Sequence, residues 1–125
     1  MGMYTELVLK AHVKPNLPVE VESVLQALFN NVTMTTPTPD HPFFRCDRWS
    51  VIGQCCSYYH VPWVSSRYSD GRIFSRSDLK NYDGEITKFI EWVSSYLDEP
   101  AGNCIGWSWY EEDPVPTLIL KGKTP

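Results

Sequence analysis

The chain has 125 residues and a formal net charge of −4 at pH 7, with 42% hydrophobic and 14% aromatic residues. This length fits one domain with its own hydrophobic core, and this composition excludes a chain that is disordered throughout. We therefore expect a single domain spanning residues 1–125. The acidic balance argues mildly against nonspecific nucleic-acid binding, which needs a basic surface.

The N-terminal residues 1–14 alternate polar and apolar side chains and lack the basic and apolar segments of a signal peptide. No segment approaches the roughly 20 apolar residues that a membrane-spanning helix needs. These features predict a cytoplasmic protein without membrane association. In that compartment the four cysteines are expected to be reduced and mostly buried thiols.

The first predicted elements are a strand and a helix. Apolar residues at every second position over 5–13 predict a strand with one face on the core. A helix follows, with Asn16 or Leu17 as its cap and Pro18 in its first turn. An apolar stripe at helical spacing supports it: Val21, Val24, Leu25, Leu28 and Phe29.

Residues 33–42 are rich in threonine and proline and predict an exposed loop. The stretch 43–59 has two interpretations. Asp47 could cap a short helix that turns Trp49 and Ile52 inward, or the same residues could form a strand. We favour a short helix or turn that leads into a strand near residues 54–59.

The next predicted element is a hairpin. Residues 63–68 and 72–78 are rich in strand-forming side chains, and they flank Ser69-Asp70-Gly71. An Asp-Gly pair between such segments is typical of a hairpin turn, because glycine accepts the positive φ that a tight turn requires.

A second helix and two strands complete the chain. Asp83 is the expected helix cap, and residues 100–102 end the helix. The helix has a second apolar stripe: Ile86, Phe89, Ile90, Val93 and Leu97. Residues 104–110 alternate again and predict a strand with one apolar side: Ile105, Trp107 and Trp109. The closing strand covers 117–121.

This order of elements predicts an α+β fold. Runs of neighbouring strands favour an antiparallel sheet, here of four to five strands, with the two helices packed on one face.

Charge is distributed unevenly. All five arginines lie between residues 45 and 76, whereas residues 83–113 carry eight acidic residues and one lysine. Several arginines neighbour aromatic residues, a combination found in protein interfaces and in single-strand nucleic-acid sites. The same aromatics could instead fill the core. The candidate binding residues are Arg48, Trp49, Arg67, Tyr68, Arg72, Arg76, Trp107 and Trp109.

Catalytic and metal sites have weaker support. Cys55, Cys56 and His60 carry suitable side chains, but their spacing is not that of a zinc knuckle. A catalytic cysteine also needs a base and an orienting group in space, which the sequence does not show. Residues 111–113 fit a solvated acidic turn better than a carboxylate pair. We therefore assign no catalytic residue, metal ligand or cofactor.

Several short motifs run through most of the chain: His41-Pro42-Phe43-Phe44, Asp47-Arg48-Trp49, Cys56-Ser57-Tyr58-Tyr59, Leu79-Lys80-Asn81-Tyr82-Asp83, Ile86/Phe89/Ile90/Trp92, Gly106 to Glu112, and Pro116 to Ile119. On these motifs the chain resembles a family of small uncharacterised proteins encoded in bacteriophage and prophage genomes. The resemblance implies a viral or prophage origin and action in the cytoplasm of an infected bacterial cell. It carries over no site residues.

We therefore expect a small accessory protein that binds a host or viral macromolecule through a non-catalytic surface. A host or phage protein is the first candidate partner. The alternative is a nucleic-acid-binding module that uses the arginine- and aromatic-bearing hairpin of residues 63–78. A third hypothesis is an enzyme or metalloprotein centred on Cys55, Cys56 and His60.

Overall fold

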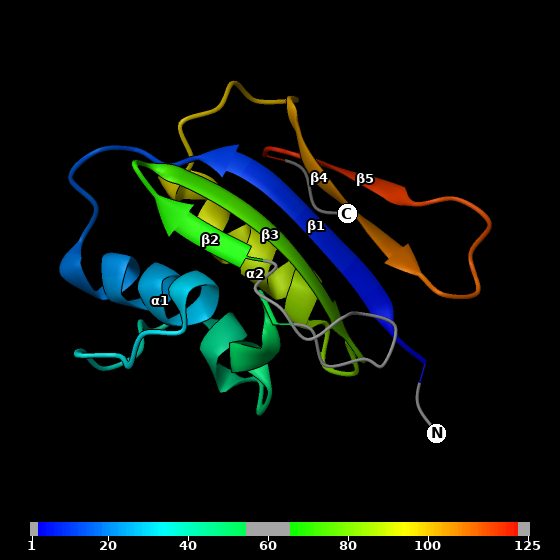
Figure 1. The fold of residues 1–125 in the computed structure, drawn as a ribbon, viewed down its shortest axis with the longest axis horizontal. Coiled ribbons are helices and arrows are strands. Elements are labelled where there is room, and N and C mark those ends of the chain that lie inside the picture. The colour runs from blue at the N-terminus through cyan, green and yellow to red at the C-terminus, as the bar shows by residue number, and fades with distance from the viewer. Residues whose placement is uncertain (1–2, 55–65, 123–125) are drawn as a thin grey trace.

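The computed structural model describes residues 3–54 and 66–122, which form one five-stranded antiparallel sheet in the order β2-β3-β1-β4-β5 (Figure 1). The strands are β1 (Thr5–His12), β2 (Ser66–Ser69), β3 (Arg72–Leu79), β4 (Cys104–Tyr110) and β5 (Thr117–Leu120). The helices are α1 (Val19–Asn30) and α2 (Glu85–Val93), with short 3-10 turns η1 (Pro42–Arg45), η2 (Trp49–Val51) and η3 (Ser94–Tyr96). The predicted α+β fold is confirmed.

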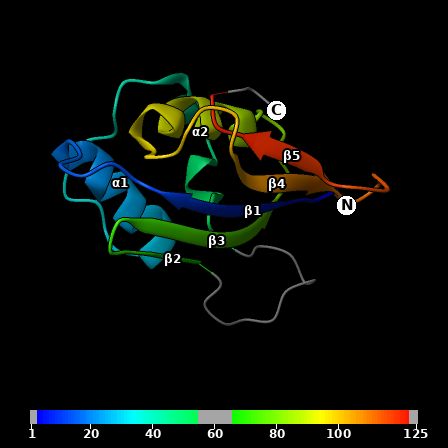
Figure 2. The same cartoon turned by 90° about the horizontal axis from the view of Figure 1, so that it is seen from above.

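The central strand is β1, which pairs with β3 on one side and β4 on the other. The predicted alternation of buried and exposed side chains along β1 is confirmed, because Leu7, Leu9 and Ala11 are buried in the core. α1 lies on this same side of the sheet: the buried Tyr68 of β2 donates its hydroxyl to Glu22 of α1. Viewed from above, α2 runs alongside the sheet and α1 lies across the end where β2 and β3 join (Figure 2).

α1 buries its predicted apolar stripe, but it begins later than expected. Its N-cap residue is Pro18, and no side chain caps it. Asn16 adopts a left-handed conformation with φ of 58°. It therefore turns the chain between β1 and α1 and does not act as the cap; Leu17 does not cap the helix either.

α2 also buries its stripe, and Leu97 joins it beyond η3. Gly84 is the N-cap residue, in the left-handed conformation that glycine tolerates. The side chain of Asn81, and not that of Asp83, supplies the capping bond by accepting from the backbone N–H of Ile86 at 3.0 Å.

Residues 41–52 form the part of the core that the sequence left undecided. His41 accepts a hydrogen bond from the backbone N–H of Phe43 and so begins η1. Phe43 is fully buried among rings from η1, η2 and α2. We call these residues the helix-side aromatic cluster: Phe43, Phe44, Trp49, Phe89 and Trp92.

The predicted short helix after residue 47 is the 3-10 turn η2. Its N-cap residue is Arg48, without a side-chain bond, so Asp47 does not cap it as predicted. This single 3-10 turn directs Trp49 and Ile52 toward the core, as the predicted helix would have done, and Ile52 is fully buried there. The strand predicted at 54–59 lies outside the described residues from position 55 onward, as do residues 63–65 of the predicted hairpin.

β4 contains the main departure from simple alternation. A register shift between Cys104 and Gly106 forms a β-bulge. Ile105 is consequently buried in the core, whereas Trp107 pairs with Val8 on the opposite face. The expectation that Ile105 shares one side with Trp107 and Trp109 was therefore wrong, because the bulge reverses the alternation between them.

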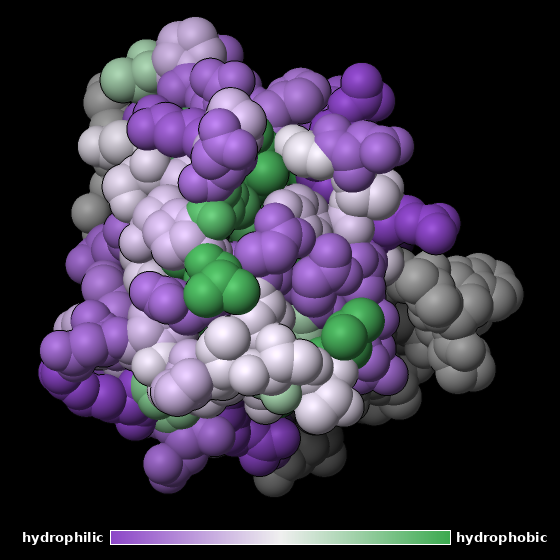
Figure 3. Space-filling view, turned by 90° about the vertical axis from the view of Figure 1, so that its left-hand side faces the viewer, coloured by the Kyte–Doolittle hydropathy of each residue, from purple (hydrophilic) through white to green (hydrophobic). Residues whose placement is uncertain are grey.

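The surface away from the sheet includes the loop of residues 33–42 and the end of the molecule that holds α1. No residue of the loop 33–42 is buried. At the end of the molecule that holds α1, hydrophobic residues form small separate areas among hydrophilic ones (Figure 3). Within residues 3–54 and 66–122, no helix is long and apolar enough to cross a membrane.

Candidate functional site

The sheet face opposite the core is the candidate site, and we call it the open face. Directly paired residues of an antiparallel sheet point to the same side, so the register identifies its members. They are Arg67 and Ser69 of β2, Arg72, Phe74, Arg76 and Asp78 of β3, Glu6, Val8, Lys10 and His12 of β1, Cys104, Trp107 and Trp109 of β4, and Leu118 and Leu120 of β5.

An apolar row crosses the middle of the open face. Val8 pairs with Trp107, and Trp107 pairs with Leu118. Leu118 is 60% exposed and Trp107 is partly exposed. The indole N–H of Trp107 has no hydrogen-bond partner in the described part of the chain. Apolar side chains left on a sheet face in this way are a recognised sign of a binding surface.

The β2 side of the open face is basic. Phe74 pairs with Arg67 on one side and with Lys10 on the other. Arg72 lies two residues before Phe74 on the same face and pairs with His12. Phe74 is 57% exposed, which makes it the most exposed aromatic side chain of the sheet. An exposed ring therefore lies between two cationic side chains.

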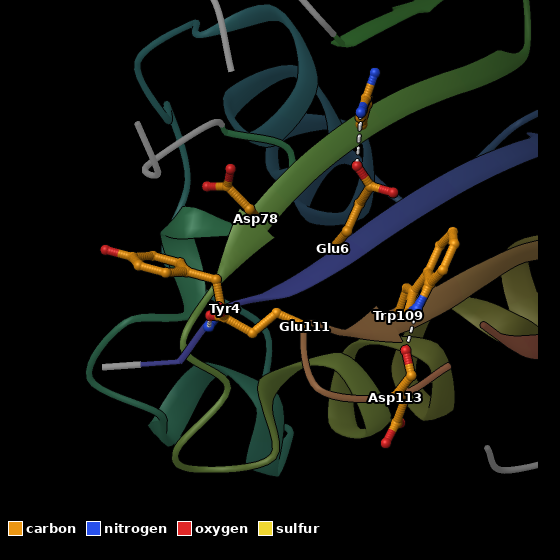
Figure 4. A pocket seen from close by; sticks show the side chains of 7 residues that line it. Tyr4, Glu6, Asp78, Trp109, Glu111 and Asp113 are labelled. Atoms are coloured by element: carbon orange, nitrogen blue, oxygen red, sulfur yellow. Dashed lines mark hydrogen bonds and ion pairs between the residues drawn. The ribbon is translucent and has the colours of Figure 1, made fainter. Parts of the chain in front are cut away.

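The opposite end of the open face is an acidic pocket of about 500 Å³ (Figure 4). Figure 4 shows Tyr4 and Trp109 on opposite sides of this pocket. Its lining residues are Tyr4, Glu6, Arg76, Asp78, Trp109, Glu111 and Asp113. With four carboxylates and one arginine, the pocket has the opposite charge to the β2 side.

Polar groups that line the pocket form hydrogen bonds with one another. Nε and Nη2 of Arg76 both donate to Glu6, at 3.0 and 2.8 Å. The indole N–H of Trp109 donates to the carbonyl of Asp113 at 2.9 Å, which holds the ring against the turn. The backbone N–H of Tyr4 donates to the carboxylate of Glu111.

The acidic turn also affects the ionisation of its neighbour Tyr110. Desolvation, and then the nearby carboxylates of Glu112 and Glu111, raise the pKa of the Tyr110 hydroxyl. The phenol is neutral at pH 7 with or without this shift, and the carboxylates give this end of the molecule a negative field. The two ends of the open face thus differ in charge, which is suited to orienting a bound macromolecule.

The structure brings together five of the eight candidate residues: Arg67, Arg72, Arg76, Trp107 and Trp109 lie on the open face. Tyr68 does not lie on the open face. Adjacent strand residues point to opposite faces, so Arg67 lies on the open face and Tyr68 is buried toward α1. Its burial and its bond to Glu22 raise the pKa of its hydroxyl.

The other two candidate residues lie on η2 and not on the sheet. Trp49 packs edge-on against Phe43 and Phe44. Arg48 is exposed beside it. The candidate residues did not include Lys10, Val8 and Leu118, nor Phe74, although Phe74 accompanies Arg72 in the arginine- and aromatic-bearing hairpin. The alternation within each strand was a usable signal for them, since each occupies the position opposite to core-facing residues.

Nucleophilic and metal chemistry finds little support among the described residues. The thiol of Cys46 is buried, and desolvation raises its pKa, which makes it a poor nucleophile. Cys104 is a free exposed thiol, unlike the buried cysteines that we expected. No group of three metal-ligating side chains occurs in residues 3–54 and 66–122. Cys55, Cys56 and His60 lie outside the described residues.

Comparison with known proteins gives no relative. No family model, no curated protein and no solved structure matches the chain. The functional argument therefore depends on the residues of the open face.

Proposed function

We propose that this protein is a non-catalytic binding protein that attaches to a host or viral macromolecule through the open face of its sheet. The resemblance to phage and prophage proteins supplies the proposed setting, the cytoplasm of an infected bacterial cell. An anionic macromolecule is the ligand that the basic side of this face favours.

One observation carries the proposal. Side chains that normally fill a core lie exposed across neighbouring strands of one face, while the other face of the same sheet already holds the core. Phe74 and Leu118 are both more than half exposed, and Trp109 is 38% exposed. Aromatic residues and arginine are the side chains most enriched where proteins bind other macromolecules.

The charge pattern supports the same proposal. The β2 side is basic and the pocket is acidic, so a partner experiences opposite fields at the two ends of one surface. Such fields increase association rates and select one orientation. The closed network of Glu6 and Arg76 in the pocket favours binding over catalysis, because both groups are already engaged.

Site-specific photocrosslinking tests this proposal without assuming the class of partner. A benzophenone amino acid replaces Phe74 on the open face, and the matched control carries it at Val32, which is also exposed but follows α1. Both variants are expressed in bacteria, and nuclease or protease digestion then identifies the crosslinked species.

We expect a crosslinked macromolecule from position 74 and little from position 32. Equal yields at both positions, or none at position 74, would overturn the proposal. A crosslinked dimer of the chain would also overturn it, since it would show that the open face is a contact between copies.

A further inference from the structure

We propose that the ligand of the open face is a single-stranded nucleic acid, held where β2, β3 and β1 lie side by side. This inference rests on the proposed function and names the class of macromolecule that the open face binds. It depends on one exposed aromatic ring, Phe74, and three cationic side chains that we call the basic triad: Lys10, Arg67 and Arg72.

The register brings these four side chains together. Arg67 and Lys10 are the direct cross-strand partners of Phe74, and such partners have Cβ atoms about 5 Å apart. Arg72 lies two residues away along β3, which is about 7 Å on the same face. A planar group stacked on Phe74 would therefore have cations on three sides.

The basic triad keeps its positive charges within the described part of the chain. None of its members forms an ion pair with an acidic residue of 3–54 or 66–122, whereas Arg76 on the same face is bound to Glu6. The nearby Glu99 is held by His12: its carboxylate accepts from the backbone N–H at 2.8 Å and lies 2.9 Å from the ring Nδ1. The hairpin contains two acidic residues: Asp70 in the turn between β2 and β3, and Asp78 at the far end of β3. Three cations against Asp70 and Glu99 still leave a positive local charge, although the whole chain carries −4.

Single-stranded nucleic acid combines the two groups that this surface would bind. Its unpaired bases stack on aromatic rings, and its phosphates pair with lysine and arginine. In a duplex the bases remain stacked on one another, so they cannot stack on Phe74. Trp107, across β1 from β3, is a second ring on the same face, although it is less exposed.

The acidic pocket sets a limit to the bound segment. Glu6 and Asp78 lie four residues along β1 and β3 from Lys10 and Phe74, which is about 13 Å. This separation exceeds the Debye length of about 8 Å at physiological salt. Repulsion from the pocket therefore does not prevent binding at the basic triad, and it acts only on a segment that extends toward the pocket.

An acidic protein segment is the competing ligand, because its carboxylates would also pair with the basic triad. It provides no planar bases for Phe74. The two ligands therefore differ in their dependence on the ring at position 74, and the test uses that difference.

The experiment measures binding of a fluorescent oligothymidylate of about 12 nucleotides, a length within the site sizes of known single-strand binders. Fluorescence anisotropy gives Kd over a series of salt concentrations. With three phosphates neutralised, the plot of log K against log salt should have a slope of about −2. Arg67→Gln should reduce the steepness by about 0.7, and Phe74→Leu should weaken binding about tenfold without changing the slope.

Phe74→Trp should restore the binding that Phe74→Leu loses, because it retains a ring. Two matched controls lie off the open face: Tyr82→Leu removes an aromatic ring that is 71% exposed, and Arg45→Gln removes an exposed arginine. Both controls should bind like the original chain. Circular dichroism checks that each variant remains folded.

Three results would overturn the inference: no binding at low salt, equal affinity for the matching duplex, or binding that Phe74→Leu leaves unchanged. Binding of oligoglutamate that is insensitive to Phe74→Leu would identify an acidic protein segment as the ligand. If crosslinking at position 74 captures a protein while oligothymidylate does not bind, the inference fails and the proposed function stands. If position 74 captures no macromolecule and oligothymidylate does not bind, both the proposed function and the inference fail.

Discussion

Aromatic residues occur on both sides of the sheet, and the two groups have opposite surroundings. In the helix-side aromatic cluster, rings contact rings. The ring centroid of Phe43 lies 5.3 Å from that of Phe89 and 4.9 Å from that of Phe44. On the open face, Phe74 has Arg67 and Lys10 as its neighbours instead. The first arrangement stabilises the fold through packing, whereas the second leaves a ring available to a ligand.

Removing one aromatic ring from each side of the sheet should give the largest difference in the free energy of unfolding. Phe43→Ala should reduce the free energy of unfolding by about 3–5 kcal/mol, because it leaves a cavity in the core. Phe74→Ala should cost less than about 1 kcal/mol, since only cross-strand contacts are lost. Urea denaturation at unchanged m-value measures both. Similar losses for the two variants would contradict the division into a packed face and an open face.

The β-bulge in β4, which places Ile105 and Trp107 on opposite faces, can be disrupted by a substitution at Gly106. A Cβ at this position would lie 1.9 Å from the carbonyl oxygen of Val8, and the backbone φ is 152°. Gly106→Ala should therefore reduce stability by about 3 kcal/mol or more.

Gly102→Ala is the matched control, because φ there is also positive, at 89°, but a Cβ would meet nothing within 4 Å. It should cost about 1 kcal/mol, from backbone strain alone. Thermal and urea denaturation distinguish the two variants, and an equal loss would show that the close approach of β4 to β1 is not what requires glycine.

The smallest effect is expected at the basic side of the open face, where Glu99 is bound to His12. Glu99 accepts from the backbone N–H of His12 at 2.8 Å and also pairs with its ring. The first and then the second of these bonds lower the pKa of Glu99. Its contribution to stability is therefore present above its unfolded pKa of about 4.3 and is lost as pH falls through the lower folded value.

Glu99→Gln should accordingly lower the melting temperature at neutral pH, by an amount equivalent to less than about 1 kcal/mol. The difference from the original chain should shrink as the pH falls below about 4. Glu91→Gln on the exposed side of α2 is the control. A difference that stays constant down to acidic pH would show that the ionised carboxylate is not responsible.

The sequence predicted the elements of this fold but not every residue of its site. The hairpin at Asp70-Gly71 is present as predicted, with positive φ at both residues. The apolar stripes of both helices are buried, as their spacing indicated. Arg67 and Tyr68 were grouped together because they are adjacent. In a strand, adjacent side chains point to opposite faces, and the register assigns Arg67 to the open one.

The helix-side aromatic cluster shows why other residues could not be placed. Its members come from η1, η2 and α2, separated by some forty residues, and no local period connects them. Trp49 therefore had two interpretations, one as an inward residue of a short helix and one, next to Arg48, as part of a binding surface. Its packing against Phe43 became visible only when these segments came together.

By itself the sequence determined the order of the described helices and strands, and the two sides of β1 and of both helices, because these follow from the local periods of 2 and 3.6 residues. Only the tertiary structure decided which side of the sheet the helices cover, where the bulge in β4 turns Ile105 into the core, and that Phe74 lies among three cations. These features depend on contacts between residues far apart in the chain, and such contacts are set by packing and strand register.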